Sequence, residues 1–262
     1  MKAKGRPIFS TLPMSPMLAM LLVVALGLPL ACSGGMAAAP GDDRLSVPEG
    51  LPNTPRAGEV GVTLKLVAWT LVQGPTGAEL YAAVRNDGTA PSCEAGMMTD
   101  FIDMAGQTVV SVGTALQSKQ LYRLDATTVI SCIDPGQIAM AAAPNLPAEV
   151  SIGELGSLTH TFPTFGGFDG LVPISGFTVS QVATVAKSAG SAYTGTLSNG
   201  FDTTVSSPSV TIFPVNRVGR PLGAATASAA IDIPPGGSWS FETSPVDDLG
   251  VAYVAYPAAS IN

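Results

Sequence analysis

From Val60 onward, short β-prone runs alternate with turn signals, and this pattern constrains the fold more than any other feature. Val62–Leu66 and Ser238–Glu242 alternate between apolar and polar residues, as half-buried strands do. Asn86–Gly88 and Asn199-Gly200 supply residues that tolerate positive φ in hairpin turns. The 29 Gly and 22 Pro residues favour turns, and helical spacing is hard to find in this part of the chain. The sequence therefore predicts an all-β protein.

The order of strand, turn and breaker occurs twice, and the two copies lie roughly 100 residues apart, the length of one β-sandwich domain. In each copy an Asx residue precedes a Gly turn, and a Pro-Gly turn comes later. These markers are Asp103, Gly106 and Pro135-Gly136 in the first copy, and Asn216, Gly219 and Pro235-Gly236 in the second. Turn chemistry explains all of them, because Asx side chains bond the nearby backbone and Gly accepts positive φ. We predict β-sandwich domains over residues 60–155 and 171–262, joined by an interdomain stretch, residues 156–170.

Two segments also resemble a known family of modules. Thr99–Gly106 and Ile212–Gly219 each join an apolar strand to a turn, and Pro135–Gln137 and Pro235–Gly237 open later strands. At these positions the chain resembles the FxLYD and related immunoglobulin-like modules of bacterial surface proteins. The resemblance implies tandem immunoglobulin-like β-sandwiches that serve in adhesion, spacing or assembly and share no active site.

The two copies differ after the Pro-Gly turn. Ile138 and Met140 carry the apolar alternation in the first copy, whereas Trp239 and Phe241 carry it one residue further on in the second. This offset predicts a longer turn in the second copy.

The N-terminus has the features of an export signal. Three cations (Lys2, Lys4 and Arg6) precede the apolar run Met17–Leu30, which is shorter than the ~20 residues of a membrane-spanning helix. The run ends in Leu28–Cys32, which resembles a bacterial lipobox. We expect a signal peptide over residues 1–31, acylation of Cys32, for example with palmitate, and a flexible tether over residues 32–59. In the lipoproteins that this segment resembles, Asp after the anchor cysteine is the usual inner-membrane retention signal, so the resemblance with Ser33 at that position implies the outer membrane. A simply cleaved signal and secretion are the alternative.

Charge and cysteine content limit the expected binding partners and indicate a disulfide. Removal of the signal would leave nine basic and nineteen acidic residues, a net charge of −10. Nucleic acid and anionic lipid surfaces, which proteins bind through Lys and Arg, are therefore not expected partners. With Cys32 acylated, Cys93 and Cys132 would remain as a pair in an oxidising compartment, where a disulfide is the default. The alternative, a redox or metal pair, lacks CxxC spacing and histidine partners.

Catalytic and metal signatures are weak. His160 is the one histidine of the chain, and no GxSxG or SxxK motif accompanies it. We predict no catalytic residue, no cofactor and no zinc site, because zinc needs three or four nitrogen or sulfur ligands. Calcium needs only oxygens, and Asp42-Asp43, Asp100 with Asp103, and Asp247-Asp248 are candidates without EF-hand spacing.

Aromatic residues offer two binding hypotheses. Seven of them could form a sugar-binding platform but are expected mainly in the core: Trp69, Tyr81, Tyr193, Trp239, Phe241, Tyr253 and Tyr256. Phe162, Phe165 and Phe168 lie in a Gly-rich stretch. They could fill the interface between the domains or form an exposed contact for a partner.

These observations favour a membrane-anchored envelope lipoprotein that acts as a non-enzymatic binding, spacer or assembly module. Another envelope protein or a surface glycan is the expected partner. A carbohydrate-binding surface protein is the main alternative, and a secreted hydrolase is a weaker one.

Overall fold

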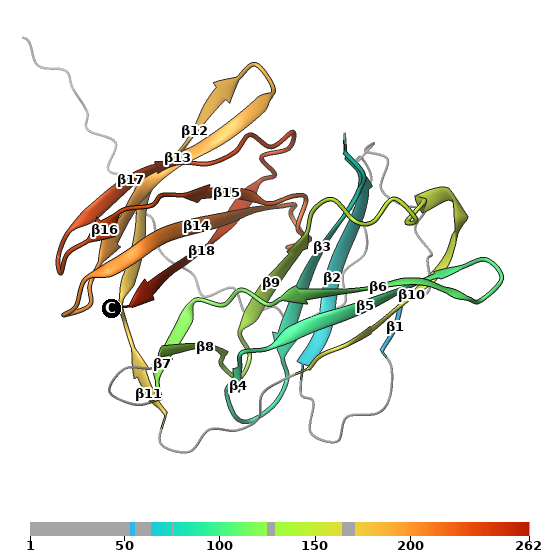
Figure 1. Cartoon of the computed structure of the whole chain (residues 1–262), viewed down its shortest axis with the longest axis horizontal. Helices are drawn as coiled ribbons and strands as arrows, with labels where there is room; N and C mark the ends of the chain where they lie inside the picture. Colours follow the sequence, from blue (N-terminus) through green and yellow to red (C-terminus); the bar gives the residue numbers. More distant parts are fainter. Residues whose placement is uncertain (1–52, 56–63, 75, 125–128, 164–170, 262) are drawn as a thin grey trace, which may run out of the picture. The chain divides into compact units, whose positions relative to one another are not determined.

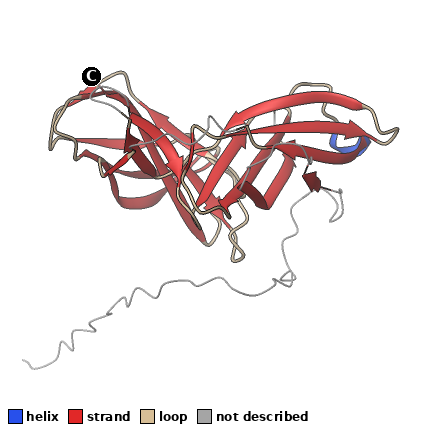
Figure 2. Cartoon of the chain, turned by 90° about the horizontal axis from the view of Figure 1, so that it is seen from below, coloured by secondary structure: helices blue, strands red, loops and turns tan. Residues whose placement is uncertain are grey.

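The computed structural model describes residues 53–55, 64–74, 76–124, 129–163 and 171–261, all within one compact unit, Ala39–Asn262. The predicted all-β class is confirmed, since strands dominate this part of the chain (Figure 2). Its single helical segment is the short 3₁₀ turn η1, Ile152–Glu154. The predicted signal peptide, with Cys32 just beyond it, and most of the tether fall outside the described residues.

We call strands β1–β10 the first repeat (Figure 1). Their bounds are β1 Asn53–Pro55, β2 Leu64–Gln73, β3 Ala78–Asn86, β4 Ser92–Cys93, β5 Gly96–Asp103, β6 Thr108–Ala115, β7 Gln120–Arg123, β8 Val129–Ile133, β9 Ile138–Ala143 and β10 Leu155–Thr161. One sheet has the order β2-β3-β9, and a second has the order β1-β10-β5-β6. A third sheet, β11-β7-β8-β4, includes β11, Val172–Ile174, which follows the first repeat in the chain.

Strands β12–β18 are the second repeat (Figure 1). Their bounds are β12 Phe177–Lys187, β13 Gly190–Asn199, β14 Val205–Val215, β15 Ala225–Ser228, β16 Asp232–Ile233, β17 Ser238–Glu242 and β18 Ala252–Ile261. One sheet has the order β12-β13-β17. In the other, β14 pairs with β15 and β16 on one edge and with β18 along the opposite edge.

Each repeat encloses its own hydrophobic core between two sheets. In the first, Leu80 and Val84 of β3 share a buried cluster with Phe101 of β5 and Leu158 of β10. In the second, the side chains that share the corresponding cluster are Tyr193 and Leu197 of β13 and Val210 and Ile212 of β14. Each repeat is therefore built of mostly antiparallel strands in two packed sheets, which is consistent with the predicted all-β sandwich class.

A buried asparagine makes the same bonds in both repeats. Nδ2 of Asn86 donates to the carbonyls of Ala90 and Ile133, at 2.8 and 2.7 Å, and its Oδ1 accepts from the N–H of Gly88. Asn199 in the second repeat repeats every bond: Nδ2 donates to Thr203 and Ile233, and Oδ1 accepts from Phe201. Both residues are at most 1% exposed. Such satisfied buried amides fix a chain path, so the two repeats share one architecture.

The Asx turns are equally duplicated. Oδ1 of Asp103 accepts the N–H of Gln107, and Gly106 at φ 80° donates to the carbonyl of Asp103. In the second repeat Asn216 accepts the N–H of Arg220 in the same way, and Gly219 at φ 77° takes the place of Gly106.

The prediction of a longer second Pro-Gly turn is wrong. Gly136 donates to the carbonyl of Asn86, and Gly236 donates to that of Asn199, so the two turns have the same register. The alternation that suggested a difference, Ile138 and Met140, lies on the outer face of the first sandwich. Ala139 and Ala141, both 0% exposed, face its core instead.

One segment that the sequence analysis assigned to a connection is a strand in the structure. Leu155–Thr161, most of which falls in the expected interdomain stretch, forms β10 and pairs with β5. Its buried residues Leu155, Leu158 and His160 are spaced too irregularly to be recognised as a strand, because the register shifts between Leu155 and Ser157. The residues of that stretch from 164 to 170 are not described.

Candidate functional site

A groove of ≈ 550 Å³ lies between the two repeats. The second repeat contributes Tyr256–Ile261 of β18, Ser209 and Thr211 of β14, and Phe177 of β12. The first repeat contributes Glu94, Leu116, Gln117, Ser118, Leu121, Val129 and Ser131. Pockets for small molecules have volumes of about 300–1,000 Å³, so the groove is large enough to hold a ligand.

An insertion in the first repeat builds one wall of the groove. In the second repeat the chain passes from Ala229, which donates to Pro208, almost directly to Ile231, which accepts from Ser207. In the first repeat the corresponding residues, Leu116 and Ser131, are separated by β7 and the start of β8. Leu121 of this insertion also packs against the core of the second repeat.

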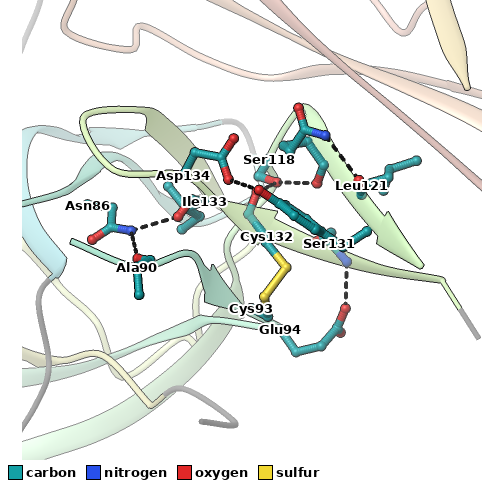
Figure 3. Close-up of a disulfide and its surroundings, with 12 residues drawn as sticks. Asn86, Ala90, Cys93, Glu94, Ser118, Leu121, Ser131, Cys132, Ile133 and Asp134 are labelled. Atoms are coloured by element: carbon teal, nitrogen blue, oxygen red, sulfur yellow. Dashed lines mark hydrogen bonds between the residues drawn. A yellow bond between two sulfur atoms is a disulfide. The ribbon is translucent and has the colours of Figure 1, made fainter. Parts of the chain in front are cut away.

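A disulfide holds the base of the insertion (Figure 3). Cys93 of β4 and Cys132 of β8 stand directly opposite each other and are joined through their sulfur atoms, the pairing that the sequence predicts. Tyr122 and Ile130 pack on the pair. Burial and the bond that Tyr122 donates to Asp134 raise the pKa of Tyr122 to about 12, so the tyrosine stays protonated.

Glu94 lines the groove beside the disulfide. Its N–H donates to the carbonyl of Ser131, and its Oε1 accepts the N–H of Ser131 at 2.8 Å (Figure 3). Glu94 has φ 47°, a conformation also found at the corresponding Ser207, φ 51°. Non-glycine residues seldom adopt such angles, so the two hydrogen bonds offset strain at this point. Glu94 is the single Asp, Glu, Lys, Arg or His among the groove-lining residues.

An apolar interface holds the two repeats against each other and so fixes the positions of the groove walls. Ala83 and Met140 on the outer face of the first sandwich share a buried cluster with Phe213 and Tyr256 on the outer face of the second. The hydroxyl of Tyr256 donates to the carbonyl of Ile138 at 3.1 Å. Thr70 donates in the same way to the carbonyl of Pro221 at 2.5 Å.

Each repeat also has the outer face through which the other repeat makes the contact, and on that unused face the corresponding residues are polar. Thr196 and Ser240 of the second repeat occupy the register positions of Ala83 and Met140. Asp100 occupies the position of Phe213, and accepts bonds from Ser111 and Thr159. At these three positions, apolar residues occur where the repeats meet and polar residues occur where they do not, so the sequence favours this contact.

Of the three residues predicted to contact a partner, the structure describes Phe162 alone. Phe162 is 5% exposed and belongs to the first core, so it is unavailable as a surface contact. Phe165 and Phe168 lie outside the described residues, as does the predicted lipid anchor Cys32.

His160 is buried in the first sandwich and is not on the groove. Its ring lies 5.1 Å from that of Phe162, edge to face, and with Trp69 and Thr99 it lines a cavity of ≈ 10 Å³. Burial lowers the pKa of His160, which keeps the ring neutral at physiological pH.

Three of the acidic residues proposed for calcium, Asp100, Asp103 and Asp248, accept hydrogen bonds in strands and turns. Asp103 caps its turn, and Asp248 accepts the N–H of Gly250 at 2.8 Å. Within the described ranges no group of three or more His, Cys, Asp or Glu side chains is placed to hold a metal. Asp42 and Asp43 fall outside those ranges.

The aromatic residues proposed as a sugar platform are mostly internal. Four of the seven are buried: Tyr81, Tyr193, Phe241 and Tyr256. Trp69 and Trp239 pack against the two cores, and Tyr253, at 45% exposure, is the one exposed member. The described residues therefore present no row of exposed aromatics.

Sequence reasoning named Tyr256 as a candidate binding residue but did not predict the groove that it lines. The residues of the groove are mostly small polar and aliphatic ones in strands and connections, with no motif among them. The one usable signal was the extra length of the first copy between Leu116 and Ser131, which marks an insertion.

Comparisons with known proteins place the chain in no family. No family model matches it, and no curated protein matches it. Among solved structures it matches a transglutaminase from red sea bream at 10% identity and a TM-score of 0.20. The match covers 74% of this chain but 27% of the transglutaminase, and at that TM-score it carries no argument about fold or activity. Within the described part of the chain, no helix has the length and apolarity to span a membrane.

Proposed function

We propose that this protein is a lipid-anchored envelope protein whose β-sandwich repeats form a non-enzymatic module for binding or assembly. Cys32 is the anchor, the tether carries the repeats away from the outer membrane, and a partner binds in the groove. The partner is another envelope component and not nucleic acid.

The groove with fixed walls is the observation that carries this proposal. A site that is formed before binding loses little conformational entropy when the partner arrives, which favours affinity. The buried cluster around Phe213 and the bonds made by Thr70 and Tyr256 hold the two repeats together. The disulfide holds the inserted wall. Hydroxyl and aliphatic side chains line the groove together, a mixture that suits a polypeptide better than a strongly charged ligand.

Site-specific photo-crosslinking in cells tests the binding role. A photoreactive residue replaces Gln117, which lines the groove, and a matched variant carries it at Gln107, an exposed turn position of the first repeat. We expect one envelope component to be captured through position 117 and not through position 107. The purified component must then bind the purified protein. Equal capture at both positions, or none at position 117, would overturn the assignment of the groove.

The anchor is tested separately by Cys32→Ala. We expect this variant to leave the membrane fraction and to lose the acyl mass from its N-terminus. Unchanged membrane retention and unchanged mature mass would contradict lipidation at Cys32.

A further inference from the structure

The first repeat shows how a short strand covers one sheet edge. β10 pairs with β5 along one edge and with β1 along the other, and the β1 pairing is parallel. In that pairing, Asn53, Thr54 and Pro55 stand opposite Leu158, Thr159 and His160. The edge of β10 is thereby closed over three residues.

The second repeat leaves the corresponding edge open. β18 is the equivalent of β10, because it pairs with β14 as β10 pairs with β5. β11 precedes β12 as β1 precedes β2, but it pairs with β7 of the insertion instead. No described strand pairs with the other edge of β18.

The backbone directions along β18 follow from β14. The carbonyls of Pro208 and Pro214 accept bonds from Ala229 and Leu222, so even-numbered residues of β14 around them face the β15 side. Successive residues of a strand face opposite edges, so Thr211 and Phe213 face β18 and bond their partners there. Those partners, Tyr256 and Val254, have even numbers.

The odd-numbered residues of β18 therefore direct their N–H and C=O groups toward the open edge. They are Tyr253, Ala255, Pro257, Ala259 and Ile261. Proline within a strand is found where its missing N–H would face away from the sheet, and Pro257 fits that rule. The open edge thus offers four N–H donors and five carbonyl acceptors.

This edge borders the groove. The six consecutive residues Tyr256–Ile261 all line it, although their side chains point alternately to opposite faces. Ala259 and Ile261 pack on the second core, whereas Tyr256 packs in the interface between the repeats. Consecutive residues can line one space only if the edge of the strand, and not one of its faces, is directed at it.

The opposite wall indicates which side chains an added strand would carry. Leu116, Leu121 and Val129 are apolar, Ser118 and Ser131 are small and polar, and the single charged residue is Glu94. An extended segment with small or aliphatic side chains fits this wall, with a basic residue near Glu94. An acidic segment does not fit.

We propose that an extended peptide segment of a partner protein binds in the groove by adding to the open edge of β18 as a parallel strand. The parallel direction follows from β1 on the equivalent edge of the first repeat. Main-chain hydrogen bonds provide the affinity, and the wall of the insertion selects the side chains. This inference rests on the proposed binding function and specifies its partner.

Amide hydrogen exchange on the intact mature protein tests strand addition directly. The probe is a synthetic peptide of about twelve residues, either from the component captured at position 117 or selected from a displayed library on the purified protein. The free amides of Tyr253, Ala255, Ala259 and Ile261 should exchange fast without peptide and at least about tenfold more slowly when it is bound. The amides of Val254 and Ala258, which face β14, should change little.

A backbone variant provides a second measurement. Ala259→Pro removes one donor from the open edge and leaves the bonds to β14 in place. Val251→Ala, which alters an exposed side chain outside the groove, is the matched control. One lost hydrogen bond of about 1 kcal/mol corresponds to roughly fivefold weaker peptide binding, and the control should bind normally. Thermal unfolding of both variants checks that they are folded.

The outcomes separate this inference from the proposed function. Capture of a partner at position 117 without protection of the odd-numbered amides would overturn strand addition and leave groove binding intact. If the odd-numbered amides are protected from exchange without peptide, and more so at higher protein concentration, a second copy of this chain pairs with the edge. That result would overturn the proposal of a different partner protein. Failure of the library to yield any peptide that binds wild type better than Ala259→Pro would also overturn it.

Discussion

The repeat predicts where a second disulfide can be introduced. Cys93 and Cys132 stand opposite each other next to the pair Ser92 and Ile133. In the second repeat the same register positions hold Ser206 and Asp232, next to Val205 and Ile233. Ser206 donates to Oδ1 of Asp232 at 2.6 Å, a hydrogen bond in place of the covalent link. If the repeats are equivalent, Ser206→Cys/Asp232→Cys should form a disulfide without rearrangement.

The magnitude follows from chain entropy. The two positions are separated by 26 residues, and closing a loop of that size removes about 3.5 kcal/mol of conformational freedom from the unfolded chain. The variant loses the exposed hydrogen bond between Ser206 and Asp232, which contributes about 1 kcal/mol. We therefore expect a net gain of about 2.5 kcal/mol in the free energy of unfolding.

Urea denaturation of the oxidised variant in a Cys32→Ser background measures this gain, and non-reducing mass spectrometry establishes the second crosslink. Ser206→Ala/Asp232→Ala is the control that loses the hydrogen bond without gaining a crosslink. Failure of the new cysteines to pair, or an oxidised variant no more stable than the alanine control, would refute the equivalence of these strand positions.

Three further predictions concern single side chains. Asn199→Ala should cost about 3 kcal/mol in urea denaturation, because three buried hydrogen bonds lose their partner at about 1 kcal/mol each; a cost below about 1 kcal/mol would contradict the role of the amide. Burial lowers the pKa of His160, so the unfolded chain takes up a proton below pH ~6.5 that the folded protein resists. The free energy of unfolding should therefore decrease as the pH is lowered from 7 to 5, and His160→Leu should make this decrease smaller. An unchanged pH dependence in the variant would contradict the role given to His160. Tyr256→Phe removes the bond to Ile138 between the repeats and should cost about 1 kcal/mol, with Tyr253→Phe, an exposed position, as the neutral control in the same melts.

Local chemistry made the class and the repeat readable from the sequence alone. An Asx residue before a turn and a Gly at positive φ act on backbone within a few residues. Asp103 and Asn216 therefore marked corresponding turns without any knowledge of the fold. The pairing of Cys93 with Cys132 was predicted from the count of cysteines, on the assumptions that Cys32 is acylated and that the compartment is oxidising. Alternating apolar and polar residues likewise gave the all-β class.

The core face of β9 was not readable, because much of this strand is buried on both sides and has no polar face to orient it. Ile138 and Met140 looked like core residues of β9, yet the core side of that strand is lined by Ala139 and Ala141. Met140 instead packs against the second repeat.

The groove was decided by the tertiary structure alone. Its walls come from a first-repeat insertion and from the last strand of the chain, which are distant in sequence. The open edge of β18 exists because β11 pairs with β7 and not with β18. Which edge a short strand joins depends on the relative free energies of two distant pairings, and no local pattern in the sequence records that difference.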